Sequence, residues 1–437
     1  MKKLLSVMAI FFATTLIYSQ SNMSDINSRG KKNDAQVVQH GNTNTSDIDQ
    51  VGWYNKADVS QKGHLNNAVV DQIGSYFSYA KVTQVANRNS ARQTQRDFYN
   101  IGKIDQDGKA NEAVQNQSGA NWYSWGGNKA SIIQRGNSNR AVQVQNATRF
   151  GFTKNVASAE QHGKSNYTVQ HQFGSGNNSA VDQRGEGHQA FEYQDGYANK
   201  STTNQKGGGE DDEPELMTAD EGSVTEAHES YVFQLGNGNV QMTDQKGNGN
   251  DAYTSQIGNR NTSTTKQTGH NVLSYTLQMG DGNIAYTEQA GNGSFSATSQ
   301  FGDKNTSSTT QDSKSNESYV LQVGDENEQT TFQTGNSNES WEFQYGDENS
   351  ATTEQHGHDG WSFIKQKGND NEANVDQRGH LNWSLTMQCG NANEASVVQR
   401  GMENSSKIFQ RGYGNTSDVV QHGGGGNGNG CGNGGGH

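Results

Sequence analysis

Glutamine recurs every 11 residues between positions 230 and 421, and apolar, small and polar residues keep fixed places around it. Reading back from each Gln in steps of two gives Val, Ile or Thr, then Ala or Ser, then Asn, as in Gln377, Val375, Ala373 and Asn371. A period of two places these side chains on one face of a β-strand. The pattern therefore predicts one short strand in each unit, with the amide-bearing face turned inward.

A turn signal follows every predicted strand. Gly stands two residues after the Gln in 17 of the 18 units, Ser313 being the exception, and Asn stands five residues after it in 14 of 17. Gly followed by Asn, Asp or Gly supplies the backbone freedom for a tight reversal. Two units then close a layer of about 22 residues, and layers stacked about 4.8 Å apart place Gln over Gln and Asn over Asn. We expect an all-β, amyloid-like β-solenoid of strand-arc-strand layers.

The expected structural ladder consists of inward-facing amides, because a buried amide without a stacked partner is costly. Its Gln members are Gln234, Gln245, Gln256, Gln267, Gln278, Gln289, Gln300, Gln322, Gln333, Gln344, Gln355, Gln366, Gln377, Gln388, Gln399, Gln410 and Gln421, and its Asn members are Asn316, Asn327, Asn338, Asn371, Asn382 and Asn393. Glu342 occupies an inward position that neighbouring units give to Val320, Ile364 and Thr386. We expect a local distortion there or a protonated carboxyl.

The pattern Ser-x5-Gln-x-Gly-x2-Asn-x-Ala-x3-Gln resembles the curlin repeat of bacterial curli fibre subunits, and residues 318–333 and 371–388 approximate it closely. The resemblance covers nearly the whole chain after residue 20, with many more repeats than the curli major subunit. It implies a secreted structural subunit of extracellular amyloid fibres in a biofilm matrix, with a role in adhesion. It also implies export through an outer-membrane pore, a nucleator on the bacterial surface, and self-association.

The repeats divide the chain into five parts. Residues 1–19 combine Lys2 and Lys3 with an apolar run, which is typical of a signal peptide. Residues 20–205 form an irregular repeat block whose extra residues we expect to bulge outward without changing the strand register. Residues 206–229 form an acidic insert, with nine carboxylates and no Lys or Arg between 210 and 229. Residues 230–422 are the regular block, and residues 423–437 are a Gly/Asn-rich tail that we expect to be flexible.

Composition narrows the class of function. Only 29% of residues are hydrophobic, against about 45–50% in globular domains, so amide ladders must supply much of the order. A net charge of −13 disfavours nucleic acid or anionic lipid as a partner. No later apolar stretch approaches the roughly 20 residues that a membrane span needs. Cys389 and Cys431 form no disulfide framework, although Cys431 could cross-link subunits.

Catalytic signatures are not found: the sequence has no Ser-His-Asp pattern, no phosphate-binding loop before Lys and no His-Glu-x-x-His motif. We expect neither enzymatic activity nor a cofactor. The weak metal candidates are carboxylates stacked in successive layers, Asp281, Asp303, Asp325 and Asp347, which either recruit a cation or replace Asn as turn formers. His358 and His380, with His356 nearby, are a Zn or Cu alternative.

The outward positions differ between the two sheets. Alternate units of the regular block carry an apolar row that we expect to be a lateral contact face, formed by Tyr231, Phe233, Tyr275, Leu277, Tyr319, Leu321, Trp341 and Phe343. The opposite sheet is mostly polar, and outward residues of the first block, such as Asp47, Asp58, Lys81 and Arg92, suggest that the apolar row is confined to the second block. This face favours fibre bundling or adhesion to a surface.

The alternative to a fibre subunit is a monomeric β-solenoid adhesin or another surface-binding or ice-binding module. Ice binding would require a flat outward array of Thr. The candidates Thr265, Thr287, Thr309 and Thr331 stand at positions whose side chains we expect to face inward. This counts against ice binding.

Overall fold

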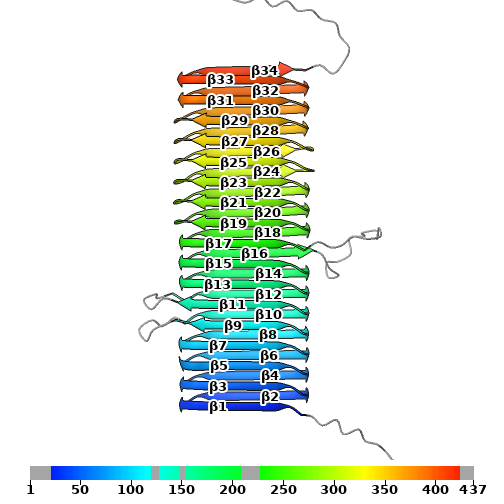
Figure 1. Ribbon diagram of the computed structural model, residues 1–437, viewed down its shortest axis with the longest axis vertical. Helices are drawn as coiled ribbons and strands as arrows, with labels where there is room; N and C mark the ends of the chain where they lie inside the picture. Colours follow the sequence, from blue (N-terminus) through cyan, green and yellow to red (C-terminus); the bar gives the residue numbers. More distant parts are fainter. Residues whose placement is uncertain (1–20, 120–126, 148–152, 208–226, 424–437) are drawn as a thin grey trace, which may run out of the picture.

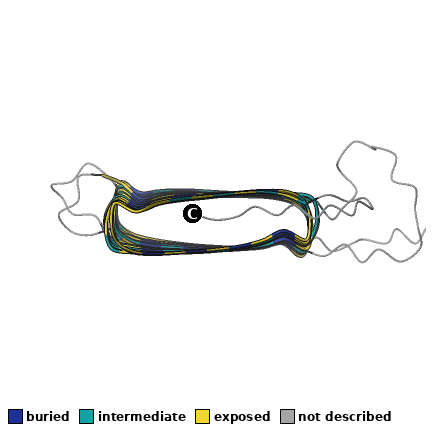
Figure 2. Ribbon diagram, turned by 90° about the horizontal axis from the view of Figure 1, so that it is seen from above, coloured by how far each residue is buried: buried dark blue, intermediate teal, exposed yellow. Residues whose placement is uncertain are grey.

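The computed structural model describes residues 21–119, 127–147, 153–207 and 227–423, which form 34 β-strands. Odd-numbered strands form one 17-stranded parallel sheet and even-numbered strands form another. Each strand is hydrogen-bonded to the strand two places along the chain, so consecutive strands lie in opposite sheets. Figure 1 shows the layers stacked along the long axis, and Figure 2 shows them superposed as one flattened ring. The expected all-β solenoid is confirmed.

The strands of both sheets are seven to ten residues long. The odd sheet contains β1 (Met23–Lys31), β3 (Thr45–Trp53), β5 (Asn67–Tyr76), β7 (Ser90–Phe98), β9 (Glu112–Ser118), β11 (Arg140–Ala147), β13 (Tyr167–Ser175), β15 (Gln189–Tyr197), β17 (Glu229–Asn237), β19 (Asp251–Ile257), β21 (Leu273–Met279), β23 (Phe295–Phe301), β25 (Glu317–Val323), β27 (Glu339–Tyr345), β29 (Trp361–Lys367), β31 (Trp383–Asn391) and β33 (Ser405–Tyr413). The even sheet contains β2 (Asp34–Asn42), β4 (Lys56–His64), β6 (Tyr79–Asn87), β8 (Ile101–Lys109), β10 (Lys129–Asn137), β12 (Val156–Lys164), β14 (Asn178–Glu186), β16 (Lys200–Gly207), β18 (Val240–Asn248), β20 (Thr262–His270), β22 (Ile284–Asn292), β24 (Thr306–Asp312), β26 (Glu328–Thr334), β28 (Ser350–His358), β30 (Glu372–His380), β32 (Glu394–Met402) and β34 (Thr416–His422).

The glycine two residues after the repeating Gln of the regular block has a positive φ, and the layer that follows it leaves no room for a Cβ atom at its place. Gly324 has φ of 126°, and a Cβ atom there would lie 2.1 Å from the carbonyl oxygen of Gly346 in the next layer. Ser313, the one exception in the regular block, keeps a positive φ of 91°. Left-handed backbone at this place thus brings successive arcs into contact.

The irregular steps of the first block leave the register intact, as expected. Gln117 lies opposite Gln145 across one insert, and Gln205 lies opposite Gln245 across the longest one. The single extra residue after Gln72 is accommodated as a bulge before Ser75. β16 reaches Gly207 and β17 begins at Glu229, so both ends of the 206–229 segment belong to the solenoid.

Several sequence expectations fall on residues outside the described ranges. These are the signal peptide, most of the acidic insert, and the tail from residue 424, which includes Cys431. Among the residues that the structure does describe, no helix is long and apolar enough to span a membrane.

The interior is apolar near the two ends and polar in the middle. One cluster of buried Ile, Val and Ala runs from Ile48 to Ala159, and a second runs from Ala351 to Ile408. Between them the buried side chains are mainly Gln, Asn, Ser and Thr, including Thr265, Thr287, Thr309 and Thr331. These Thr residues face inward, so they form no outward array.

Candidate functional site: amide ladders and the outer face of the odd sheet

Every Gln that recurs at the 11-residue spacing in the regular block belongs to a continuous chain of hydrogen bonds. Gln322 Nε2 donates to Gln344 Oε1 at 2.9 Å and to the carbonyl oxygen of Thr306 at 2.9 Å. The pattern repeats from Gln234 to Gln421 in both sheets and includes Gln311. Each amide therefore joins its own layer to the next one, and all of these donors point toward the C-terminal end.

The arc Asn residues form a second kind of ladder that runs in the opposite sense. Asn349 donates its backbone N–H to Asn327 Oδ1 at 3.1 Å and its Nδ2 to the Gly368 carbonyl at 2.7 Å. The same contacts involve Asn316, Asn338, Asn371, Asn382 and Asn393. A side-chain acceptor thus satisfies the backbone donor of the next arc wherever Asn stands at this position, which holds those arcs in register.

Replacing both Gln322 and Gln344 by Leu is expected to destabilise their layers by about 1–3 kcal/mol for each buried group left without its partner. Hydrogen exchange of β25 and β27 should show the loss, and fibre growth should slow. Thr330→Leu, at an outward position of β26, is the matched control. Unchanged exchange rates and growth in the double variant would contradict the ladder's structural role.

Glu342 is buried inside β27, at the inward position that the sequence indicates. Its Oε2 accepts hydrogen bonds from Thr331 Oγ1 at 2.8 Å and from Gln329 Nε2, and its Oε1 accepts one from Ser340 Oγ at 3.1 Å. Burial raises the pKa of this carboxyl to about 7, and the hydrogen bonds only partly oppose the shift. The layer keeps its register at Glu342, so the carboxyl is accommodated without backbone distortion.

Glu192 is a second buried carboxyl, which the sequence analysis did not single out. It lies two residues before Gln194 in β15, at the position equivalent to Glu342, and accepts hydrogen bonds from Ser179 Oγ and Gln170 Nε2. Burial raises its pKa as well. A list of the residues two places before each Gln of the first block would have identified Glu192 as an inward-facing residue.

His188 and His228, also missed, replace Asn in one arc ladder. His228 N–H donates to His188 Nδ1 at 3.1 Å, and Asn250 N–H donates to His228 Nδ1 at 3.1 Å. Because each Nδ1 accepts, each Nε2 carries the proton, and His188 Nε2 donates to the Gly207 carbonyl at 2.9 Å. The fully buried rings stack with centroids 4.8 Å apart. Burial lowers both pKa values, that of His228 to about 4.

The stacked acidic residues make the contacts of turn formers. Asp281 N–H donates to Asp303 Oδ1 at 2.8 Å, and Asp325 N–H donates to Asp347 Oδ1 at 3.0 Å. Asn259 and Asn391 make the same kind of contact in neighbouring layers. Each carboxylate is thus engaged by a backbone donor, and the contacts support Asp as a substitute for Asn. Cation binding by this column stays a prediction.

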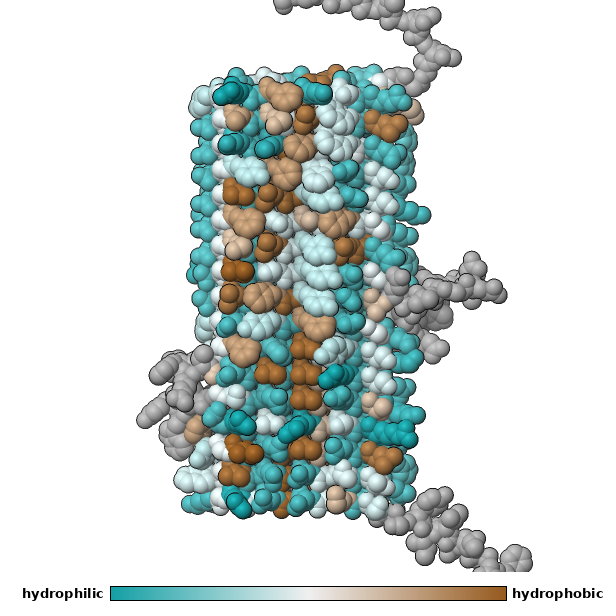
Figure 3. Space-filling view, viewed as in Figure 1, coloured by the Kyte–Doolittle hydropathy of each residue, from teal (hydrophilic) through white to brown (hydrophobic). Residues whose placement is uncertain are grey.

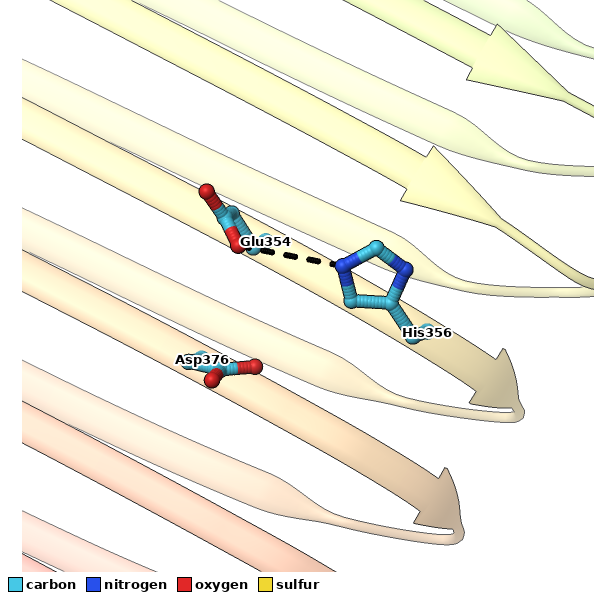
Figure 4. A group of neighbouring side chains, drawn as sticks. All are labelled: Glu354, His356 and Asp376. Carbon is cyan, nitrogen blue, oxygen red and sulfur yellow. Dashed lines mark ion pairs between the residues drawn. The ribbon is translucent and has the colours of Figure 1, made fainter.

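The tightest group of candidate metal ligands among the described residues is Glu354, His356 and Asp376, whose ligand atoms lie within 4.8 Å of one another (Figure 4). His356 Nε2 lies 3.7 Å from Glu354 Oε2, but Asp376 is already paired with Arg378 Nε at 3.0 Å. We therefore interpret this group as two ion pairs, one within β28 and one within β30. His358 and His380 stack at 4.9 Å in the adjacent arcs, as their spacing predicts.

The outward apolar row lies on the odd sheet, where rings from successive layers stack along the axis. Tyr231 and Tyr253 have centroids 5.0 Å apart, and Tyr319 and Trp341 have centroids 4.0 Å apart. Phe233, Tyr275, Leu277, Leu321 and Phe343 stand in the same register. Figure 3 shows a nearly continuous column of hydrophobic side chains along one broad face.

The apolar row extends further than the sequence analysis expected. Phe191 and Tyr193 of β15 stack on Tyr231 and Phe233, and Val169 of β13 continues the row below them. The expectation of a polar first block was wrong here because Asp58 and Lys81, on which it partly rested, lie in the even sheet. Asp47 and Arg92 do lie on the odd sheet, but nearer the N-terminal end.

Curlin-associated repeats are recognised at residues 30–63, 346–379, 368–401 and 390–423. The first segment covers β2 to β4 with the arc before them, and the last three together run from the end of β27 to the end of β34. No curated protein matches the chain.

Proposed function

Because this chain carries curlin-associated repeats, we propose that it is a structural subunit of curli-like extracellular fibres. The repeats and the solenoid fold support a structural protein rather than an enzyme. Fibres would grow by docking the last layer of one molecule on the first layer of another. No substrate or cofactor is required.

The observation that carries the proposal is the open strand edge at each end of the solenoid. β1 and β2 pair only with β3 and β4, and β33 and β34 pair only with β31 and β32. Unpaired parallel edges are templates for further strands. Neither end is covered by another strand of the described chain.

The two ends also match each other chemically. Gln421 Nε2 donates only within its own layer, to the Ser405 carbonyl, and would meet Gln39 of the next molecule. Gln410 would meet Ser28, whose hydroxyl already takes the place of an amide by donating to Gln50 Oε1 at 2.9 Å. Both Gln columns would then continue across the junction.

Gly412 provides a direct test of this junction. A Cβ atom at Gly390, one layer below, would lie 1.9 Å from the Gly412 carbonyl, whereas at Gly412 it would meet only Asn415 Nδ2 at 3.5 Å. The free space is where Gly30 of a second molecule would place its carbonyl. We expect Gly412→Ala to leave the monomer folded and to slow elongation about tenfold, since such a clash costs roughly 1–3 kcal/mol.

Gly414→Ala is the control for an added methyl group in the same arc, because Gly414 has a φ of 64° and a Cβ atom there has nothing within 4 Å. Gly412 has a φ of 123°, which suits Ala less well, so hydrogen exchange of β33 must show that the Gly412→Ala monomer keeps this strand. Elongation would be followed by thioflavin fluorescence, and the product by a fibre reflection near 4.7–4.8 Å. Equal elongation of the two variants would exclude the proposed junction. Failure of the wild-type chain to form such fibres would instead favour a monomeric adhesin.

The proposal extends to secretion and partners. The signal-peptide pattern of residues 1–19, together with the repeat family, supports export to the cell surface, passage through an outer-membrane pore, and initiation by a surface nucleator. A role in biofilm matrix or adhesion would follow from fibre formation.

A further inference from the structure

The outer face of the odd sheet is divided into an acidic and a basic segment. Strands β15 to β27 have no Lys or Arg on this face and carry five carboxylates, namely Asp195, Glu229, Asp251, Glu317 and Glu339. Strands β29, β31 and β33 contain no Asp or Glu and carry four basic residues, namely Lys365, Lys367, Lys407 and Arg411. We call these the acidic segment and the basic segment.

Aromatic rings run through both segments and bridge their boundary. Trp341 and Phe343 of the acidic segment contact each other, and Phe343 contacts Phe363 of the basic segment with centroids 5.5 Å apart. Rings stacked along the axis cover each other's faces and leave their edges outward. The face is therefore an apolar strip whose two ends carry opposite charge, with a groove where Ser255, Ala297 and Ser299 replace large side chains.

The basic groups remain available at the surface. Lys407 Nζ lies 5.3 Å from the centroid of Trp383, and Lys365 Nζ lies 5.7 Å from that of Tyr345. In the described part of the chain, the ion pairs found include none of the four basic residues. The charges of Lys365 and Lys407 are thus held over aromatic rings.

We infer that this face binds the same face of a second copy of the chain, with the two long axes running in opposite directions. The inference deepens the proposed fibre function, because it defines how neighbouring fibres associate laterally. A two-fold axis through β25 would place β33 against β17, β31 against β19 and β29 against β21. Lys407 and Arg411 would then face the strand that carries Glu229, in a self-complementary interface.

The charge distribution decides between the two possible directions. If the copies ran in the same direction with layers in register, the basic segments would face each other, and so would the acidic segments. Like charges brought together across an interface cost several kcal/mol, whereas complementary patches favour association. The opposite direction avoids that repulsion and brings opposite charges together at β33 and β17, while β29 and β31 face strands that offer no basic residue.

The size of the strip suits a stable contact. Nine layers from β17 to β33 span about 40 Å and seven residues of strand about 20 Å, giving on the order of 800 Å² per partner, the size of a standard protein interface. Figures 1 and 2 show that the layers stack without visible twist. The columns of two copies can therefore stay in contact along their whole length.

Charge reversal tests the inference. One variant changes Lys365, Lys367, Lys407 and Arg411 to Glu, a second changes Glu229 and Asp251 to Lys, and a third combines both sets. We expect each of the first two alone to reduce fibre bundling, seen by electron microscopy, at least about tenfold, the equivalent of about 1.4 kcal/mol. The combined variant, and an equal mixture of the first two, should bundle like wild type.

The outcomes separate the pairing from fibre formation. Thioflavin kinetics report fibre growth, which the reversal of Glu229 and Asp251 should leave unchanged because β17 and β19 lie far from the junction strands. Sedimentation of the unassembled chain reports pairing even where no fibres form. In pairs of single, unassembled chains, gold bound to a tag at the C-terminus should mark both ends of the particle. Bundling and sedimentation unaffected by reversal, or gold at one end only, would overturn the inference.

Discussion

Replacing Glu342 by Val is expected to remove a pH-dependent destabilisation of about 3 kcal/mol that the layers around β27 carry at a pH well above 7. The pKa of Glu342 rises from an ordinary 4.5 to about 7 in the fold, and a tenfold change in a protonation equilibrium corresponds to about 1.4 kcal/mol. Below pH 4.5 the carboxyl is protonated in both folded and unfolded chains, so it carries no ionisation penalty. The penalty grows between pH 4.5 and 7 and is complete above pH 7.

Val fits because the neighbouring layers already hold Val320 and Ile364 at this place. Hydrogen exchange of β25, β27 and β29 on both sides of this pH range would measure the effect. Glu339→Val, outward on the same strand, is the control and should not remove the pH dependence. A variant whose local stability equals that of wild type above pH 7 would show that the carboxyl is solvated.

Changing His188 and His228 together to Asn is expected to stabilise β15 and β17 in acid by about 3 kcal/mol or more. The folded-state pKa of His228 is about 4 against an ordinary 6.5, so the unfolded chain binds protons that the folded chain rejects. The stability of the wild type is complete above pH 6.5 and is lost as pH falls toward 4. Asn supplies the same acceptor and donor without a titratable ring.

The measurement is the local exchange rate of β15 and β17 in wild type and variant between pH 4 and 7. Changing the other stacked pair, His358 and His380, to Asn provides the control, because those rings are not fully buried. If acid weakens the wild type and the His188/His228 variant equally at these strands, another group is responsible.

The period of the sequence was sufficient to predict the fold. A Gln with a Gly two residues later and an Asn five residues later specifies an inward amide, a left-handed arc and the next strand, so the 22-residue layer follows from counting. The same count of residues does not identify the position of a residue that follows an insert. His228 is six residues before Gln234 but separated from Gln205 by the acidic insert, and its role as an Asn substitute depends on which ring nitrogen faces the next layer.

The outer face was only partly predictable, for a different reason. Alternate units belong to alternate sheets, so a list of outward residues has to be divided by sheet before a surface can be recognised. In the first block, irregular steps hide that alternation, and Val169, Phe191 and Tyr193 were not assigned to the row that they continue. The division of this row into acidic and basic segments emerges only when the strands are placed side by side.

The strands lie across the long axis (Figure 1), so a rod pulled by its ends would load all hydrogen bonds between two layers at once. Mechanical strength would then depend on the layer boundary with the fewest bonds. Val272 and Gly360 leave the arc N–H groups of Ser294 and Asn382 without the side-chain acceptor that Asn provides elsewhere in that column. In force spectroscopy, rupture within the regular block should begin at these two boundaries, and restoring Asn at both positions should raise the force required.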